Sequence, residues 1–205
     1  MLTRSLLLAA AAGLLSLPAL AQVPGMMTTV PRLHLVRNHR PGSFQLADGR
    51  WQAAELYYEG GEWLSVRQPG VDGRREYLPQ DVPRFVIKAD TFGVVQGYGP
   101  ADRQGGAGVF GQELYRTPYH ALFSYREAEG DNMSLTLLQP LGGAAVSIPQ
   151  GRKSFTNVML PIFGDCPEVA EGIRRGRFGP QHVKRMMALY AQWKRTAGAA
   201  APPRG

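Results

Sequence analysis

The side chains that could carry out chemistry in this sequence are few and lie far apart. Cys166 is the only cysteine, and it stands before Pro167 and Glu168 at the expected start of a helix. A thiol at a helix N-terminus has a lowered pKa, which favours the reactive thiolate. His182 follows sixteen residues later, but no nucleophile motif of a known enzyme family joins the two. We therefore expect a thiol packed at a helix start, and keep a redox-sensitive thiol, an intermolecular disulfide and catalysis as alternatives.

Three glycines, Gly106, Gly108 and Gly111, match the G-x-G-x-x-G spacing of dinucleotide-binding sites. Such a site requires a buried strand before the glycines and a helix after them, whose N-terminus binds the pyrophosphate. Here other glycines precede the motif, and Tyr115 and Pro118 follow it where the helix would begin. The spacing alone does not indicate a dinucleotide site, and we expect no cofactor.

Histidines and carboxylates offer no convincing metal site. His34 and His39 have four residues between them, which is within zinc spacing, but on a strand their odd separation turns them to opposite faces. Glu127, Glu129 and Asp131 cluster in an expected turn, without the ligand pattern and closing Glu of a calcium loop. We therefore expect no metal site and no catalytic residue, because no nucleophile is paired with a base.

Aromatic side chains gather in one expected hairpin, at Trp51, Tyr57, Tyr58 and Trp63. If they are exposed together, such rings could stack on a sugar or a peptide. If they are buried, they form the core of the hairpin. We favour the core interpretation and keep Trp51, Tyr57 and Trp63 as candidate contacts with a ligand or partner.

The N-terminus has the pattern of a secretory signal peptide. Residues 1–21 contain a positive Arg4, an apolar run over residues 6–17, and small residues at Ala19 and Ala21. The apolar run has the length of a signal sequence and is too short to span a bilayer. We expect cleavage after Ala21 and export to the periplasm or the medium, and we expect that the chain is not an integral membrane protein. The alternatives are an uncleaved anchor and a buried N-terminal helix.

Basic residues gather in the C-terminal quarter of the chain. Residues 152–205 contain ten Lys and Arg against three Asp and Glu, whereas residues 22–151 contain twelve against thirteen. Basic surfaces attract anionic membranes and nucleic acids. For an exported chain we expect no nucleic-acid partner, and take Lys184, Arg185 and Arg195 as candidate contacts with an anionic membrane surface or another envelope component. A solvated helix face without a partner is the alternative.

Strand patterns dominate the first part of the chain. After a flexible lead-in at residues 22–31, a β-rich domain is expected over residues 32–152. Asp48-Gly49, Gly60-Gly61 and Asp72-Gly73 separate short apolar runs, and such dipeptides are typical of hairpin turns. They predict an antiparallel meander, interrupted by an exposed glycine-rich loop at 96–111. The expected strands are 32–36, 43–46, 51–58, 63–67, 74–78, 83–89, 121–126, 133–137 and 144–148, and the strand pattern is expected to resume after the loop at about Leu114.

Helical spacing begins near Lys153 and predicts a helical segment over residues 153–195. Ser154 could cap a first helix that Pro161 kinks or ends, and Asp165 could cap a second. A disordered tail is expected at 196–205. Together these elements predict an α+β fold, with an antiparallel β-sheet meander, curled into a roll or partly closed barrel, followed by two or three short C-terminal helices.

Several short motifs occur in an order that resembles a family of uncharacterised exported bacterial proteins. The resemblance covers roughly residues 44–194. It implies export, a β-rich middle and C-terminal helices, and it implies no particular activity. The sequence departs from the family at Ala191, where Asn is usual. The motifs are Asp48-Gly49, the stretch Tyr77–Phe85, Asp165-Cys166-Pro167 and the pair Tyr190-Ala191.

Three functions follow from the sequence as hypotheses. The first is an exported, non-enzymatic module that binds or scaffolds a component of the cell envelope. The second is a ligand-binding β-roll whose cavity takes a small apolar molecule, and the third is an unrecognised hydrolase, which the lack of a paired nucleophile and base disfavours. A large apolar cavity would favour the second, and an exposed apolar or basic patch would favour the first.

Overall fold

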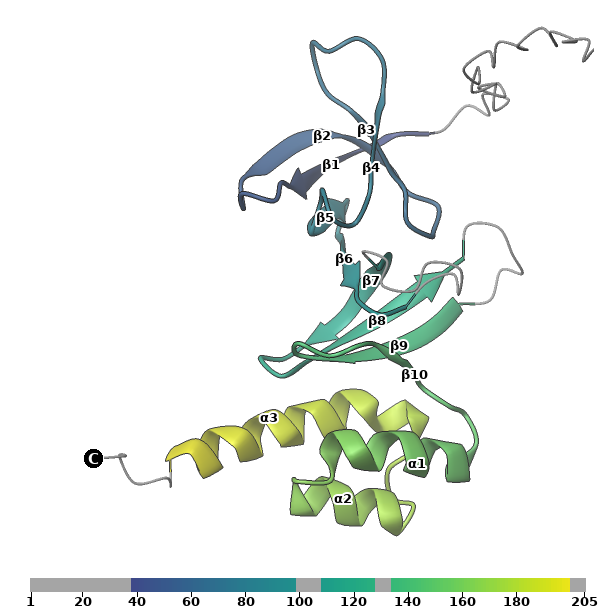
Figure 1. Ribbon diagram of the computed structural model, residues 1–205, viewed down its shortest axis with the longest axis vertical. Helices are drawn as coiled ribbons and strands as arrows, with labels where there is room; N and C mark the ends of the chain where they lie inside the picture. Colours follow the sequence, from purple (N-terminus) through teal and green to yellow (C-terminus); the bar gives the residue numbers. More distant parts are fainter. Residues whose placement is uncertain (1–37, 99–107, 128–133, 200–205) are drawn as a thin grey trace, which may run out of the picture. The chain divides into compact units, whose positions relative to one another are not determined.

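The computed structural model describes residues 38–98, 108–127 and 134–199. The strands of these residues form one antiparallel sheet in the order β10-β9-β8-β7-β6-β5-β1-β2-β3-β4 (Figure 1). Strands that follow one another in the chain are paired, except that the chain returns after β4 so that β5 pairs with β1. This confirms the predicted meander, although the sheet ends at β4 and β10 and does not close into a barrel. The strands are β1 (Arg40–Gln45), β2 (Trp51–Tyr57), β3 (Leu64–Arg67), β4 (Arg75–Tyr77), β5 (Arg84–Ile87), β6 (Asp90–Val95), β7 (Val109–Arg116), β8 (His120–Arg126), β9 (Ser134–Pro140) and β10 (Val146–Ser147).

The three predicted hairpin turns are confirmed. Asp48-Gly49 joins β1 to β2, Gly60-Gly61 lies between β2 and β3, and Asp72-Gly73 lies between β3 and β4. Gly49 and Gly73 have φ angles of 85° and 86°, which residues with a Cβ rarely adopt. The dipeptides therefore fix three hairpins because the backbone needs glycine at these positions.

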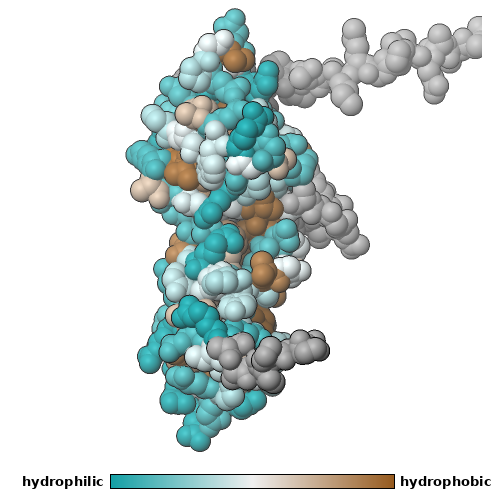
Figure 2. All heavy atoms as spheres, turned by 90° about the vertical axis from the view of Figure 1, so that its left-hand side faces the viewer, coloured by the Kyte–Doolittle hydropathy of each residue, from teal (hydrophilic) through white to brown (hydrophobic). Residues whose placement is uncertain are grey.

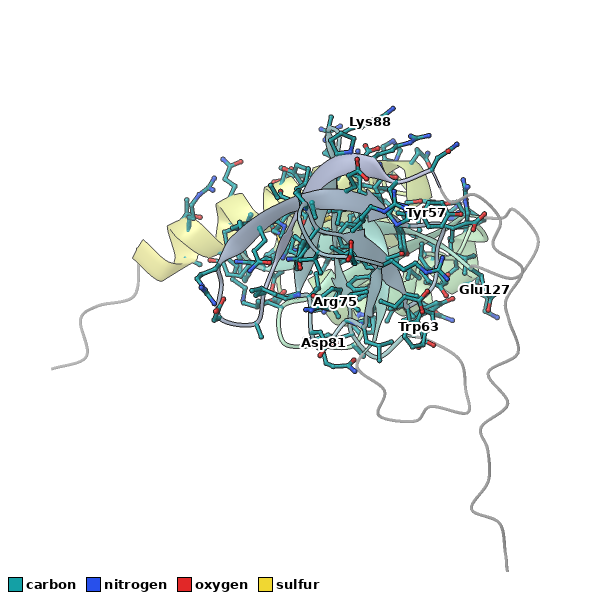
Figure 3. The ribbon with its side chains drawn as sticks, turned by 90° about the horizontal axis from the view of Figure 1, so that it is seen from above. Tyr57, Trp63, Arg75, Asp81, Lys88 and Glu127 are labelled. Carbon is teal, nitrogen blue, oxygen red and sulfur yellow. The ribbon has the colours of Figure 1, made fainter. Side chains whose placement is uncertain are left out.

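Strand β6 is absent from the prediction, because the turn before it carries no glycine. Lys88 has a φ of 57° and is the only residue other than glycine with a positive φ among the described residues. It turns the chain from β5 into β6, where Ile87 pairs with Asp90. Figure 3 shows Lys88 at the margin of the molecule. A tight turn at lysine has no recognisable sequence signal. The strand predicted at 83–89 therefore contains β5 and the turn of a hairpin whose second strand, β6, was not predicted.

The expected loop at 96–111 is wrong at its end, because β7 begins at Val109. The side chains of Val109 and Phe110 are buried, and Gly111 lies inside the strand. A Cβ at Gly111 would lie 2.8 Å from Val95 Cγ2 and 3.1 Å from Phe123 Cβ. Glycine is therefore required here for close packing between strands rather than for a loop.

A first core comes only from strands and the connection between β4 and β5. Aromatic rings dominate its centre. The Phe85 ring is stacked on the Phe92 ring, with 4.7 Å between the ring centroids. The rings of Phe110 and Tyr58 contact the Phe85 ring edge-on, with centroid distances of 5.1 and 5.3 Å. The buried members are Phe44, Ala54, Leu56, Leu64, Val66, Val82, Phe85 and Phe110.

A second core lies between strands β8–β10 and the helices. Leu122 and Leu138 face each other across β8 and β9 and pack with buried side chains of every α-helix. The opposite face of the same strands carries Phe123 and Leu137, which pack with Val95 of β6. Strands β8 and β9 are thus buried on both faces. The helices are α1 (Arg152–Phe163), α2 (Pro167–Arg174), the 3₁₀-helix η1 (Pro180–His182) and α3 (Val183–Ala199).

The helix boundaries differ from the prediction in three details. Gly151 rather than Ser154 precedes α1, and Pro161 lies within its last turn without ending it. Cys166 rather than Asp165 is the N-cap of α2. Helix α3 continues to Ala199, past the expected boundary at 195.

None of the helices that the structure describes is both long enough and apolar enough to cross a membrane. The longest, α3, is amphipathic, with Met186 and Met187 buried in the second core and Lys184 and Arg185 exposed. Its apolar side chains are therefore used for packing against the sheet.

Candidate partner-binding surfaces

Exposed basic side chains gather where the start of α1, the end of α2 and the start of α3 meet. Figure 1 shows these three helix ends on one side of the helical layer. The guanidinium group of Arg152 lies against Gly176, where a Cβ would be 2.6 Å from Arg152 Nη2. The guanidinium group of Arg185 lies 5.8 Å from the centre of the Phe178 ring. We call this group the basic end, and its members are Arg152, Lys153, Arg174, Arg175, Arg177, Lys184 and Arg185.

The positive charge of the basic end is barely neutralised. Within the described part of the chain, Arg175 is the one member that forms an ion pair, with Glu171 one turn earlier in α2. The remaining six side chains are exposed and carry charge into solvent. Figure 2 faces the opposite side of the helical layer, where α3 ends, and shows mostly hydrophilic side chains there as well. The basic end can therefore attract a polyanion or an anionic surface.

Two of the three predicted basic contacts belong to this surface. Lys184 and Arg185 do, but Arg195 follows Arg185 by ten residues, which is about 15 Å along a helix. Arg195 is exposed near the other end of α3. The contribution of Arg152 and of the segment after α2 could not be recognised from the sequence, because only the fold brings these helix ends together.

The predicted aromatic cluster is divided by the structure. Tyr58 packs into the first core, as the core interpretation requires, and donates a hydrogen bond to the Phe110 carbonyl at 2.5 Å. Trp51 and Trp63 are 46% and 42% exposed, so the core interpretation is wrong for both. Trp51 and Tyr57 share the outer face of β2 but are about 20 Å apart at the ordinary rise of a strand. Figure 3 shows Trp63 apart from Tyr57 as well.

Tyr57 instead lines an open groove of about 380 Å³, which we call the Tyr57 groove. One wall is the end of β2 and the turn after it. The floor is one face of β6, β7, β8 and β9, the face that also carries Phe110 of the first core, and here Phe92 pairs with Gln112 and Gln112 pairs with Ser124. The lining residues are Tyr57, Tyr58, Glu59, Gly60, Phe92, Gln112, Ser124, Arg126 and Ser134.

Hydrogen bonds fix the polar groups of the Tyr57 groove. Tyr57 donates from its hydroxyl to Glu59 Oε2 at 2.5 Å, and the hydroxyl oxygens of Ser124 and Ser134 are 2.5 Å apart. The Gln112 amide donates to Asp90 Oδ1 at 2.9 Å. The groove therefore offers oriented acceptors and donors around partly buried rings.

A second open groove, of about 320 Å³, lies beside a charge network of β5 and β7. Glu113 accepts from Arg84 Nη2 at 3.0 Å and pairs with Arg116 Nη2 at 2.7 Å. Arg84 Nε is buried without a hydrogen-bond partner. The Glu113 carboxylate lies between the guanidinium groups of Arg84 and Arg116 and neutralises part of their charge. We therefore interpret these three side chains as a structural ion-pair network.

His120 lies at the start of β8, against the helices. Its imidazole is 5% exposed and packs on the rings of Phe163 and Tyr190, with centroids 4.8 and 4.9 Å away. Burial lowers the pKa of His120 to about 4, since the charged form would lose its hydration; Asp165 opposes this shift and Lys194 adds to it. His120 Nδ1 is buried without a partner. A neutral imidazole therefore forms part of the junction between sheet and helices.

Asp165 joins α3 to the start of α2. Its Oδ2 accepts a hydrogen bond from the Tyr190 hydroxyl at 3.0 Å and from Lys194 Nζ at 2.8 Å. Burial opposes ionisation of this carboxyl, but the bonds from Lys194 and Tyr190 outweigh it and lower the pKa of Asp165. The aspartate that the sequence assigned to a helix cap therefore anchors α3 instead.

The predicted thiol lies in the helical core. Cys166 is buried among the side chains of α1, α2 and α3, as expected for a packed thiol at a helix start. His182 accepts a hydrogen bond from the Gly179 amide at its Nδ1, at 3.1 Å, within η1. Burial leaves the thiol little access to a substrate, so a packing role accounts for it.

The remaining sequence candidates hold little chemistry in the described residues. Gly108 and Gly111 lead into a strand rather than a helix, so the dinucleotide geometry is absent there; Gly106 lies outside the described residues. His39 Nε2 is 3.2 Å from the Ser65 hydroxyl, and His34, Glu129 and Asp131 lie outside the described residues. Among residues 38–98, 108–127 and 134–199, no three His, Cys, Asp or Glu side chains are placed to hold a metal ion.

Comparison with protein-family models, with curated proteins and with solved structures finds no match to this chain. The resemblance to an exported family stays a prediction. Function is therefore inferred from the geometry of the described residues, and the basic end and the Tyr57 groove are the candidate surfaces used below.

Proposed function

We propose that this protein is an exported, non-enzymatic module that binds an anionic surface of the cell envelope through its basic end. The observation that carries the proposal is the gathering of seven exposed Lys and Arg side chains from three helix ends, with a single ion pair among them in the described residues. The signal-like N-terminus supports export, and the buried Cys166 speaks against thiol catalysis.

The magnitude of the interaction favours a membrane surface as the anionic partner. Each Lys or Arg near an anionic lipid surface contributes about 1 kcal/mol, and the attraction decays within a Debye length of about 10 Å at 0.1 M salt. Only side chains that reach the surface together contribute in full. The basic end presents several from adjoining helix ends, whereas Arg195 is about 15 Å away along α3.

Co-sedimentation with vesicles tests the proposal. The chain from Gln22 to Gly205 should bind vesicles that contain phosphatidylglycerol, leave vesicles of phosphatidylcholine unbound, and be released by about 0.5 M salt, where screening is strong. Arg185→Glu should weaken binding at least fivefold. The matched control is Arg195→Glu, which makes the same charge change on the same helix and should alter binding much less. Equal effects of both variants, or binding that ignores salt, would contradict a localised surface.

Export needs its own measurement. Cell fractionation of a C-terminally tagged chain, with sequencing of the mature N-terminus, should give a protein that begins at Gln22 and is released from the envelope by a salt wash. A chain that keeps residues 1–21 would instead be anchored by them. A processed chain that never associates with the envelope would count against the basic end as a contact surface.

A further inference from the structure

We propose that the Tyr57 groove binds a neutral saccharide. This inference goes beyond the envelope-binding proposal, because it uses other residues and another ligand chemistry. The basic end lies on the helices, whereas the groove lies on strands of the sheet and against the turn after β2. Either surface could act without the other.

The strand register builds a polar floor. Phe92, Gln112 and Ser124 occupy directly paired positions on β6, β7 and β8, so their side chains emerge side by side on one face. Neighbouring strands are about 4.8 Å apart, and Arg126 follows Ser124 by two residues on that same face. Four side chains of different chemistry are thereby presented to one ligand.

The donors and acceptors of this groove suit hydroxyl groups. An ionised Glu59 can only accept, Arg126 can only donate, and the Gln112 amide and Ser124 hydroxyl can do both. A sugar carries adjacent hydroxyls that each donate and accept, so it can satisfy such a mixed set. An apolar ligand would displace water from the charged groups of Glu59 and Arg126 without replacing its hydrogen bonds, which is costly.

The charge of the groove favours a neutral ligand. Glu59 and Arg126 are the charged side chains in its lining, and their charges cancel. An anion would be attracted by Arg126 and repelled by Glu59, and a cation the reverse, so neither gains a net attraction from the two charges. This balance contrasts with the basic end, which suits anions.

Aromatic rings supply the remaining part of a saccharide site. The Phe92 ring is held parallel to the Phe85 ring at 4.7 Å, and the hydrogen bond to Glu59 fixes the Tyr57 hydroxyl. The negative face of an aromatic ring attracts the C–H groups on the apolar face of a sugar. The groove volume, about 380 Å³, lies in the range of small-molecule sites.

Nuclear magnetic resonance titration of the chain from Gln22 tests this inference. The probes are the methyl glycosides of glucose, galactose, mannose and N-acetylglucosamine, because together they vary the hydroxyl stereochemistry and add an acetamide. At least one should shift the amide signals of Tyr57, Gln112 and Arg126 in a saturable way. A dissociation constant near 1 mM to 10 mM is expected for a single ring in an open groove. Four flat titrations up to 100 mM, or shifts confined to residues outside the groove, would overturn the inference.

Matched variants locate the site. Tyr57→Ala should weaken binding at least tenfold, while Trp51→Ala, which removes an exposed ring from the same face of β2, should leave it unchanged. Glu59→Gln is the second test if Tyr57→Ala unfolds, because Glu59 is exposed and its replacement leaves the core intact. Binding that survives both groove variants, or that falls with Trp51→Ala, would contradict the assignment. Loss of vesicle binding by the basic end would leave these outcomes unaffected.

Discussion

The two ends of the sheet bury their apolar faces in different ways. Around β1–β5 the core consists of strands and the β4–β5 connection, with aromatic rings packed on one another. Around β8–β10 the strands pack against helices, and Leu122, Leu138 and Ile148 depend on α1, α2 and α3 for cover. A sheet face can thus be covered by its own curvature or by a separate layer.

This difference indicates which strands depend on the helices for their stability and which do not. Loss of a helix contact should loosen β8 and β9 before it affects β1–β3, because the first core contains no helical residue. Both partner surfaces follow the same division. The basic end belongs to the helical layer, and the Tyr57 groove belongs to the sheet.

The largest effect is expected in the strand-only core. Phe85→Ala removes the ring that Phe92, Phe110 and Tyr58 all contact, and should lower the free energy of unfolding by about 4 kcal/mol. Denaturant unfolding measures the loss, and hydrogen exchange should quicken first in β1, β2 and β5. Exchange that quickens equally in β8 and β9 would show one shared core instead of two.

The corresponding change in the helical core is Met159→Ala, at a fully buried position of α1. Its cavity should cost about 3 kcal/mol. Here the amides of β8 and β9 should lose protection while those of β2 and β3 keep theirs. A pattern identical to that of Phe85→Ala would break the comparison.

Acid should weaken the junction of sheet and helices through His120. Its pKa, about 4, is below the ordinary 6.5, so the unfolded chain takes up a proton at a higher pH than the folded chain. Stability therefore falls as the pH drops from 6.5 to 4, by about 3 kcal/mol for the full difference. His120→Phe should abolish this part of the pH dependence. An unchanged profile in the variant would exclude His120 as the titrating group.

The smallest effect concerns the anchor of α3. Tyr190→Phe removes the hydroxyl that donates to Asp165 and should cost about 1 kcal/mol. Lys194→Met breaks the other contact of Asp165, an exposed ion pair, and should lower the stability less than Tyr190→Phe does. Thermal unfolding at pH 7 compares the two. A larger loss for Lys194→Met would mean that charge, rather than the buried hydroxyl, holds α3.

The sequence predicts well those features that depend on neighbouring residues. Gly49 and Gly73 mark hairpins because the local backbone requires them, and the amphipathic spacing of α3 marks its buried side. Strand β6 is missed because Lys88 makes a turn without a glycine, and β7 begins earlier than expected because Gly111 serves packing. Local signals fail where a residue responds to distant neighbours.

The two candidate surfaces depend on such distant neighbours. Arg152 and Arg185 contact the segment after α2 only in the folded helical layer. The charge composition therefore predicts a basic C-terminal region but not which side chains form the basic end. Tyr57 is recognisable as a candidate, but Gln112 and Arg126 reach its groove from strands more than fifty residues later. The exposure of Trp51 and Trp63 also depends on which face of the sheet is covered.

The pairing of β1 with β5 joins two runs of hairpins, and it has a kinetic consequence. Gln45 pairs with Trp51 six residues on and with Arg84 thirty-nine residues on. Closing the longer loop costs roughly 2 kcal/mol more in chain entropy. The two meanders should therefore form first and meet late. Where β1 pairs with β5, a Cβ at Gly42 would lie only 2.3 Å from the Val86 carbonyl oxygen. The pairing that forms last therefore requires glycine at position 42.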